Sequence, residues 1–310
     1  MDISVVIPLY NKREFIERAI TSIMGQSFQP REIVVVDDGS TDGSAELVSA
    51  MNIPSVRLVS QKNGGVSVAR NRGVKEATSA WVAFLDGDDE WMPEFLATVK
   101  RMHDAYPDRD VYASAYYLGN YRGEKKPMGL NGVTFAGEEG VLSNYFHVAA
   151  MSAPPICSST VCIRKQALLD VGGFPLSMKS GEDLITWARL AARRAPAYCT
   201  KPLAVFWQEK AHTYDDKPNR LPEEGDPVGL ALVKLKTASS GNLTGIDLYI
   251  SHWHKMRASI YLRLNMRRKA LVEMFKGIYY NPSNSRLYAY LFMSLFPYRL
   301  IRSLFKTYAG

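Results

Sequence analysis

The stretch Phe84-Leu85-Asp86-Gly87-Asp88-Asp89 passes from an apolar strand to a cluster of carboxylates. An apolar run such as 81–85 is typical of a strand buried on both faces of a parallel sheet, and such sheets bind ligands at the carboxyl ends of their strands. Asp86 and Asp88 could there face a hard divalent cation, Mn²⁺ or Mg²⁺, which prefers oxygen ligands. The alternative is a turn before a helix cap, because Asp and Gly are common turn formers.

The chain around this stretch alternates predicted strands with predicted helices. Apolar runs predict strands over 3–8, 32–36, 56–60 and 81–85, and helical spacing of apolar residues predicts helices over 12–24, 45–51 and 66–77. This order predicts an α/β fold with a mainly parallel sheet and right-handed crossovers. Further strands are expected over 111–117, 156–163 and 197–207, a helix over 184–194, and a flexible polar loop over 208–227.

Two other strand ends carry candidate binding residues. Pro8 and Tyr10 follow the first strand, and the ring of Tyr10 could stack on a base or be an ordinary half-buried aromatic. Asp38 follows the second strand, where its carboxylate could accept a hydrogen bond from uracil or ribose, or cap a turn. Arg70 lies in the helix after Gly64-Gly65 and could reach a diphosphate. This loop matches neither the ATPase nor the dehydrogenase glycine motif.

A second pair of acids opens a helix about a hundred residues later. Glu182 and Asp183 begin this helix, and Trp187 lies four residues after Asp183 on the same face. An acid beside an aromatic ring could deprotonate a hydroxyl while the ring packs on a sugar. The alternative is purely structural, because carboxylates at a helix start suit the helix dipole.

In their order and spacing these motifs resemble the family 2 glycosyltransferases of GT-A fold. The resemblance covers about residues 1–215 and rests on the segments 4–11, 35–42, 63–71 and 84–89, on Gly172-Gly173-Phe174, and on Gly181-Glu182-Asp183 with Trp187. It implies a Rossmann-like, mainly parallel sheet flanked by helices, a nucleotide-diphospho-sugar donor, and a Mn²⁺ or Mg²⁺ ion.

The resemblance also implies a role for each candidate residue. Pro8, Tyr10 and Asp38 would line the base pocket, Arg70 would contact the nucleotide, Asp86 would hold the ribose and help place the metal, Asp88 would ligate the metal, and Asp183 would be the catalytic base. Glu182 and Trp187 would contact the acceptor or sugar. His212 occupies the place of a family histidine that could bind the metal or diphosphate, and the alternative is a plain loop histidine.

The net charge of +7 is concentrated at the end of the chain. Residues 251–310 hold eleven Lys and Arg and one acid, so they carry +10, and the first 250 residues carry −3. We expect a catalytic domain over 1–225, with a nucleotide-sugar half over 1–105 and an acceptor half over 106–225, and a helical extension over 226–310. Helices are expected over 251–278 and over 284–308, the second kinked at Pro297.

Three interpretations of this basic, aromatic extension stay open. It could pack on the catalytic domain or on a second subunit, lie as an amphipathic pair on an anionic membrane, or bind nucleic acid. Its Leu-rich and aromatic composition favours burial against lipid or protein, so no nucleic-acid partner is expected.

The function expected from the sequence is inverting, metal-dependent sugar transfer. The donor would be a UDP-sugar, and the acceptor a saccharide or lipid-linked oligosaccharide of surface polysaccharide synthesis. The alternatives are transfer to polyprenyl phosphate, and an inactive scaffold that binds a membrane or partner. Three cysteines, no predicted signal peptide and no predicted spanning helix indicate reduced thiols and a cytoplasmic protein, with a place at the inner face of the membrane.

Overall fold

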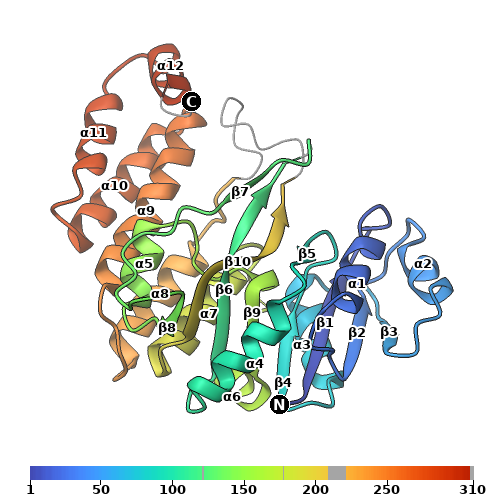
Figure 1. Cartoon of the computed structure of the whole chain (residues 1–310). Coiled ribbons are helices and arrows are strands. Elements are labelled where there is room, and N and C mark those ends of the chain that lie inside the picture. Colours follow the sequence, from blue (N-terminus) through green and yellow to red (C-terminus); the bar gives the residue numbers. More distant parts are fainter. Residues whose placement is uncertain (121, 177, 209–220, 308–310) are drawn as a thin grey trace.

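A ten-stranded sheet forms the centre of the protein, with strand order β3-β2-β1-β4-β9-β6-β10-β5, β7 beside β6 and β8 beside β10. The computed structural model describes residues 1–120, 122–176, 178–208 and 221–307 (Figure 1). The strands are β1 Ile3–Leu9, β2 Glu32–Asp37, β3 Val56–Ser60, β4 Trp81–Phe84, β5 Glu90–Trp91, β6 Val111–Gly119, β7 Lys125–Pro127, β8 Glu139–Val141, β9 Val161–Arg164 and β10 Ala197–Trp207. The α/β fold expected from the sequence is confirmed.

Helices flank this sheet and continue beyond it. They are α1 Ile16–Met24, α2 Ser44–Ala50, α3 Val66–Glu76, α4 Phe95–Ala105, α5 Tyr145–Met151, α6 Lys165–Asp170, α7 Glu182–Arg193, α8 Pro227–Ala238, α9 Ile246–Arg263, α10 Arg267–Tyr280, α11 Ser285–Met293 and α12 Tyr298–Thr307. Helices α9–α12 stand at one end of the molecule, and β1–β3 with α1 and α2 stand at the other (Figure 1).

The parallel register brings the predicted site residues to one edge of the sheet. β1 pairs in parallel with β2 and with β4, so Leu9 is opposite Asp37 and Val6 is opposite Phe84. The residues that follow these strands, Tyr10, Asp38 and Asp86, therefore emerge side by side. β9 runs antiparallel to β4, and beyond it β6 and β10 run parallel to each other.

The strand predicted over 156–163 is only half correct. Residues Ser158–Thr160 form a 3₁₀ turn, and the strand proper is β9. The side-chain oxygen of Thr160 accepts a hydrogen bond from the backbone N–H of Cys157 at 3.2 Å. Ser and Thr side chains that bond to nearby backbone in this way compete with a sheet ladder.

The helices predicted for the extension are each divided in two. The helix expected over 251–278 ends at Arg263, because Asn265 takes a left-handed conformation with φ of 58° before α10 begins. The helix expected over 284–308 is interrupted before Pro297, which separates α11 from α12. Pro297 therefore starts a new helix instead of kinking a continuous one, as its lack of an N–H favours.

The C-terminal helices contribute to two apolar cores. Val228, Leu232 and Ile250 of α8 and α9 belong to the core that includes the sheet. Farther along the chain a smaller core contains Leu262, Met274 and other residues from α9 onward. The expected boundary between 225 and 226 stays a prediction. No helix in the described part of the chain is long and apolar enough to cross a membrane.

Buried charges tie the start of α8 to α9 and α10. Glu273 pairs with His254, whose Nδ1 lies 2.7 Å from its Oε2, and with Arg257 at 3.1 Å. Asp226 accepts a hydrogen bond from Trp253 Nε1 at 2.9 Å. Asp226, His254 and Glu273 have the atoms of a metal site, but the guanidinium of Arg257 lies in the same cluster and opposes a cation. We therefore regard the cluster as a structural tie.

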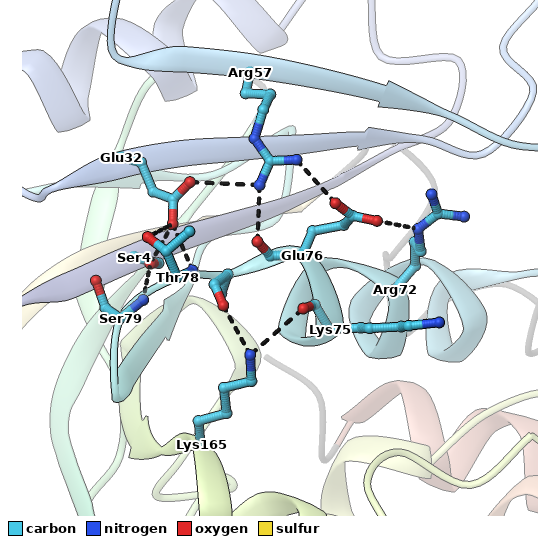
Figure 2. A network of polar contacts seen from close by, with 10 residues as sticks. Ser4, Glu32, Arg57, Arg72, Lys75, Glu76, Thr78, Ser79 and Lys165 are labelled. Carbon is cyan, nitrogen blue, oxygen red and sulfur yellow. Dashed lines mark hydrogen bonds and ion pairs between the residues drawn. The ribbon is translucent and has the colours of Figure 1, made fainter.

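Figure 2 shows a polar network of side chains from β1, β2, β3 and α3. Ser4, Glu32 and Arg57 lie near the starts of their strands, at the opposite ends from the predicted site. Glu32 accepts hydrogen bonds from Ser4 Oγ at 2.8 Å and from the backbone N–H of Thr78 at 2.7 Å. Arg57 pairs with Glu32 at 3.4 Å and with Glu76 at 2.9 Å. Although burial raises the pKa of Glu32, the hydrogen bonds from Thr78, Ser4 and Arg57 outweigh it and lower that pKa below its ordinary value.

We expect Glu32→Ala to lower the free energy of unfolding by about 1–3 kcal/mol, because it leaves several donors without their acceptor. Urea unfolding measures this difference. Glu32 has a lowered pKa in the folded state, so its contribution is present above its ordinary pKa of 4.5 and is lost as pH falls further. Arg72→Ala, which removes an exposed pair with Glu76, is the control and should cost less than about 0.5 kcal/mol. Equal losses from the two variants would contradict this account.

Candidate active site

A cleft of about 660 Å³ opens where the parallel strands end. It is lined by residues from both halves of the sheet and from the start of α7. Of the residues predicted from the sequence, the cleft brings together Pro8, Tyr10, Asp38, Arg70, Asp86, Asp88, Glu182 and Asp183. His212 and most of the predicted loop 208–227 lie outside the described residues.

Arg70 joins the two groups of acids in the cleft. Its guanidinium donates to Asp86 at 2.8 and 3.1 Å and to Glu182 at 2.9 Å, although Glu182 is 112 residues away in the chain. Burial alone would lower the pKa of Arg70, but the negative charges of Asp86, Glu182 and Asp183 raise it above its ordinary value. Arg70 therefore stays charged and holds the end of β4 against the start of α7.

A layer of aromatic rings supports this guanidinium. Arg70 lies 5.3 Å from the ring centre of Phe174, which meets Phe84 and Trp187 edge-on at 5.3 and 5.6 Å. Asn71 fixes the Phe174 backbone by donating to its carbonyl at 2.8 Å and accepting from its N–H at 2.9 Å. The segment Gly172-Gly173-Phe174 thus positions Arg70.

The position of Trp187 corrects the expectation that it packs on a sugar. Its side chain is 1% exposed and does not line the cleft, because it packs behind Phe174. The spacing that places Asp183 and Trp187 on one helix face is right, but α7 turns that face partly into the core. Phe206 and Trp207 at the end of β10 are the aromatic residues that line the cleft on this side, and no sequence motif indicated them.

Asp38 holds the loop that precedes α3. Its Oδ1 accepts from Gln61 Nε2 at 2.7 Å and from Gly64 N–H at 2.9 Å, and its Oδ2 accepts from Gly65 N–H at 2.8 Å. Gly65 has φ of 91°, a conformation that favours glycine. Asp38 is only 2% exposed, so it presents a small part of its surface to the cleft.

Asp88 has a cationic partner in the structure. Lys12 Nζ lies 2.5 Å from Asp88 Oδ2, and Arg18 donates to the Asp88 carbonyl oxygen. Each of the two acids predicted to hold a metal is thus neutralised, Asp86 by Arg70 and Asp88 by Lys12. Their side chains are about a quarter exposed to the cleft. Two cleft-facing carboxylates, each with oxygen lone pairs to spare, fit a hard divalent cation.

Hydrogen bonds of Asp89 and Ser159 hold the turn that carries Asp86 and Asp88. Ser159 Oγ accepts from the Asp86 N–H at 3.1 Å and donates to Asp89 Oδ2 at 2.5 Å. Asp89 also accepts from the Trp207 N–H at 2.9 Å. Burial, with the charges of Asp86 and Asp88, raises the pKa of Asp89 well above its ordinary value. The sequence placed three acids here but did not indicate which one points inward.

Asp183 lines the cleft and has a raised pKa. Desolvation raises its pKa to about 6, the adjacent charge of Glu182 adds to the rise, and Arg70 opposes it. Its Oδ1 accepts from the Leu184 N–H at 2.8 Å. Its Oδ2 has no hydrogen-bond partner among the described residues, so this oxygen is available to a ligand. A carboxylate with a pKa near 6 is a suitable general base near neutral pH.

Sequence comparisons find relatives that match part of this chain. It is 45% identical over 102 residues to the uncharacterised glycosyltransferase YibD of Escherichia coli strain K12, across 32% of this chain and 30% of YibD. It is 37% identical over 97 residues to TuaG of Bacillus subtilis, a glycosyltransferase named for teichuronic acid biosynthesis, across 30% of this chain and 38% of TuaG. The matches therefore span less than half of these relatives.

Solved structures share the fold over nearly the whole chain. S. aureus TarS 1-349 in complex with UDP-GlcNAc has a TM-score of 0.65 and 20% identity, covering 99% of this chain and 91% of that one. The mannosyltransferase PcManGT from Pyrobaculum calidifontis, in complex with GDP-Man and Mn²⁺, has a TM-score of 0.60 and 21% identity, covering 98% and 84%. The expected GT-A fold is thereby confirmed.

The family itself follows from the sequence model. Residues 4–168 match the model of "Glycosyl transferase family 2". This match includes the ends of β1, β2 and β4, with Tyr10, Asp38, Asp86 and Asp88, and it includes Arg70. Because the match covers more than half of the residues, the chain belongs to glycosyl transferase family 2, a family of glycosyltransferase enzymes.

Proposed function

We propose that the protein is an inverting glycosyltransferase that moves a sugar from a nucleotide-diphospho-sugar to a hydroxyl of a saccharide or lipid-linked oligosaccharide. One observation carries the proposal: Arg70 holds Asp86 and Glu182 in one cleft, with Asp88 and Asp183 beside them. Acids suited to a donor's metal ion and an acid suited to a proton thus meet there from distant parts of the chain.

The nucleotide would lie against β1 and β2. Tyr10 is 49% exposed and offers its ring to a base, with Pro8 behind it in the same cleft. Asp38 Oδ2 accepts one hydrogen bond from the protein, so a second lone pair could accept from a base N–H. We favour a UDP-sugar because one fold neighbour is in complex with UDP-GlcNAc, and the N3–H of uracil could donate to Asp38. Arg70, only 4% exposed, would support the nucleotide mainly through Asp86.

The reaction would be one displacement at the anomeric carbon of the donor. Asp183 Oδ2 takes the proton of the acceptor hydroxyl while the hydroxyl oxygen forms a bond to the anomeric carbon. The bond from the carbon to the diphosphate oxygen breaks, and the electron pair leaves with the nucleoside diphosphate. Attack from the side opposite the leaving group inverts the anomeric centre, and no covalent enzyme intermediate is needed.

Asp86 and Asp88 would hold the divalent ion, Mn²⁺ or Mg²⁺. When bound, such an ion neutralises charge on the leaving diphosphate. One fold neighbour is in complex with Mn²⁺ and GDP-Man. Asp86 would also hold the ribose, as the family resemblance implies, because it lines the same cleft as Pro8 and Asp38. His212, which lies outside the described residues, would be a third ligand.

The acceptor would enter beside α7 and the end of β10. Glu182 is engaged by Arg70, so we assign it a positioning role ahead of an acceptor contact. Phe206 is 36% exposed, and with Trp207 it lines the cleft where an aromatic surface for a sugar ring was expected from Trp187. TuaG is named for teichuronic acid biosynthesis, which supports a surface polysaccharide as the product class. The free thiols of all three cysteines suit the expected cytoplasmic location.

Ligand stabilisation and turnover test this function directly. UDP-sugars with Mn²⁺ should raise the melting temperature of the protein more than GDP-sugars do, because a ligand that binds only the folded state stabilises it. Slow release of UDP from the preferred donor should need the metal. Radiolabelled sugar should pass to a saccharide acceptor and not to polyprenyl phosphate. If no donor stabilised the protein and no donor gave UDP release, the proposal would be refuted. Product on polyprenyl phosphate would establish the alternative acceptor.

We expect Asp183→Asn to lower kcat by about 10²–10⁴, the usual contribution of a general base, with little change in UDP affinity. Asp104→Asn, which changes an exposed carboxylate on α4, is the matched control and should leave kcat unchanged. The base must be unprotonated, so wild-type turnover should fall as pH decreases through about 6, the raised pKa of Asp183. A flat profile between pH 5 and 8 would argue against this assignment.

We expect Lys12→Met to tighten Mn²⁺ binding to the nucleotide-free protein by about fivefold or more. The ammonium of Lys12 competes with a cation for Asp88, and removing one such charge is worth about 1 kcal/mol or more. Titration with Mn²⁺ followed by electron paramagnetic resonance measures the free ion. Lys100→Met, which removes an exposed lysine paired with Asp104, is the control. Asp88→Asn should weaken binding, and unchanged affinity in Lys12→Met would show that no competition exists.

A further inference from the structure

The outer side of α10 carries a row of large uncovered apolar side chains. Val272, Phe275 and Tyr279 are 53%, 61% and 80% exposed. Their spacing places them on one face of the helix, and exposed Arg268 precedes them by one turn. The opposite face holds Gly277, where a Cβ would meet side chains of α9 and α11. The row therefore points away from both neighbouring helices.

The next helix presents the same kind of surface. Phe292 on α11 is 63% exposed, and Leu295 just after this helix is 77% exposed. Leu287, on the inner side of α11, is fully buried against the smaller core. α11 lies beside α10 at the end of the molecule (Figure 1). We call Val272, Phe275, Tyr279, Phe292 and Leu295 the outer stripe.

The outer stripe is not a consequence of poor packing. Met274 and Leu287 fill the core beneath it, and the ion pairs of Glu273 tie α10 to α9. Once its apolar side is buried, a surface helix ordinarily has a polar outer side. Single exposed apolar residues are normal, whereas a row of them along one helix face, as on α10, marks a binding surface.

The exposed charges on α10, α11 and α12 are all positive. Glu273 is the sole acid after Asp247, and it is 4% exposed and faces inward. The exposed charged residues on these three helices are Arg268, Lys269, Lys276, Arg286, Arg299 and Arg302. Arg268 and Lys276 flank the row on α10, and Lys269 pairs with the exposed Glu224. A partner for this surface must therefore accept apolar and aromatic side chains and supply negative charge.

A second copy of the chain is a poor partner for such a surface. A two-fold dimer would bring each stripe, with the flanking Arg268 and Lys276, against the same stripe, and like charges would repel. Nucleic acid would meet the positive charge but would leave the aliphatic Val272 and Leu295 without a suitable contact. An anionic lipid leaflet meets both needs, because apolar side chains enter the boundary of the acyl chains while Lys and Arg remain among the phosphates.

We propose that the outer stripe rests on an anionic membrane surface, with α10 and α11 lying in the plane of the interface. Phe and Tyr rings suit this boundary because they combine apolar area with polarisable or polar edges. The surface is separate from the cleft, so the inference does not depend on the sugar chemistry. It would hold the catalytic unit beside a lipid layer, where a lipid-linked acceptor would be concentrated.

Vesicle flotation tests the proposal with the full chain. We expect binding to mixed phosphatidylcholine–phosphatidylglycerol vesicles, much weaker binding to phosphatidylcholine alone, and loss of binding as salt rises to about 0.5 M. The triple variant Phe275→Ser, Tyr279→Ser, Phe292→Ser should reduce partitioning at least about tenfold. The control triple Leu169→Ser, Leu176→Ser, Leu230→Ser changes leucines that are 50%, 68% and 65% exposed elsewhere, and it should bind like wild type.

A second variant and a light-scattering measurement of mass distinguish membrane binding from a dimer or from nucleic-acid binding. The double variant Arg268→Gln, Lys276→Gln should weaken binding to anionic vesicles several-fold and leave UDP affinity unchanged. The vesicle result does not depend on whether the protein proves to be a transferase. Equal binding of both serine triples, or binding that ignores lipid charge, would overturn the proposal. So would a dimer in light scattering that only the stripe triple dissociates, or flotation abolished by single-stranded RNA that binds at the stripe.

Discussion

The structure of the cleft depends on one buried positive charge. Asp86, Glu182 and Asp183 would repel one another if they were brought together without a counterion, and Arg70 supplies it. The residue reaches this place from α3, whereas the acids come from the end of β4 and the start of α7. Removing one partner of such a buried pair typically costs about 3–5 kcal/mol, because the remaining charge stays buried and unpaired. The guanidinium of Arg70 thus both stabilises the fold and positions the acids of the cleft.

This requirement explains features of the sequence that are distant from the cleft. Phe174 needs a fixed position to support the guanidinium, and Asn71 fixes it through two backbone hydrogen bonds. Gly173 precedes Phe174 with φ of 64°, and a Cβ there would lie 2.6 Å from Asn71 Oδ1. Trp187 closes the layer from behind. The same arrangement buries Asp183, which raises its pKa; the adjacent Glu182 adds to the rise and Arg70 opposes it.

Local patterns were sufficient for much of the fold and for the residues of the cleft. The strands at 56–60 and 197–207 were predicted to the residue, and eight of the candidate site residues line one cleft. The failures concern contacts between distant segments. Helical spacing put Trp187 on the face of Asp183 but could not tell which part of that face meets Phe174. The break at Asn265 depends on how α10 folds back on α9, and no proline or glycine marks it.

The two regions of opposite charge solve different electrostatic problems. In the cleft, Arg70 and Lys12 neutralise acids at short range, so the catalytic part is largely balanced within itself. In the extension, the buried acids Asp226 and Glu273 pair with Arg257 and His254. Asp247 pairs with Lys236, and Glu224, just before the extension, pairs with Lys269 at the surface. Arg268 and Lys276 flank the exposed apolar row on α10 and face water. An exposed apolar row is unfavourable in water, and positive charges close together repel one another. Binding to an external anionic surface would reduce both costs.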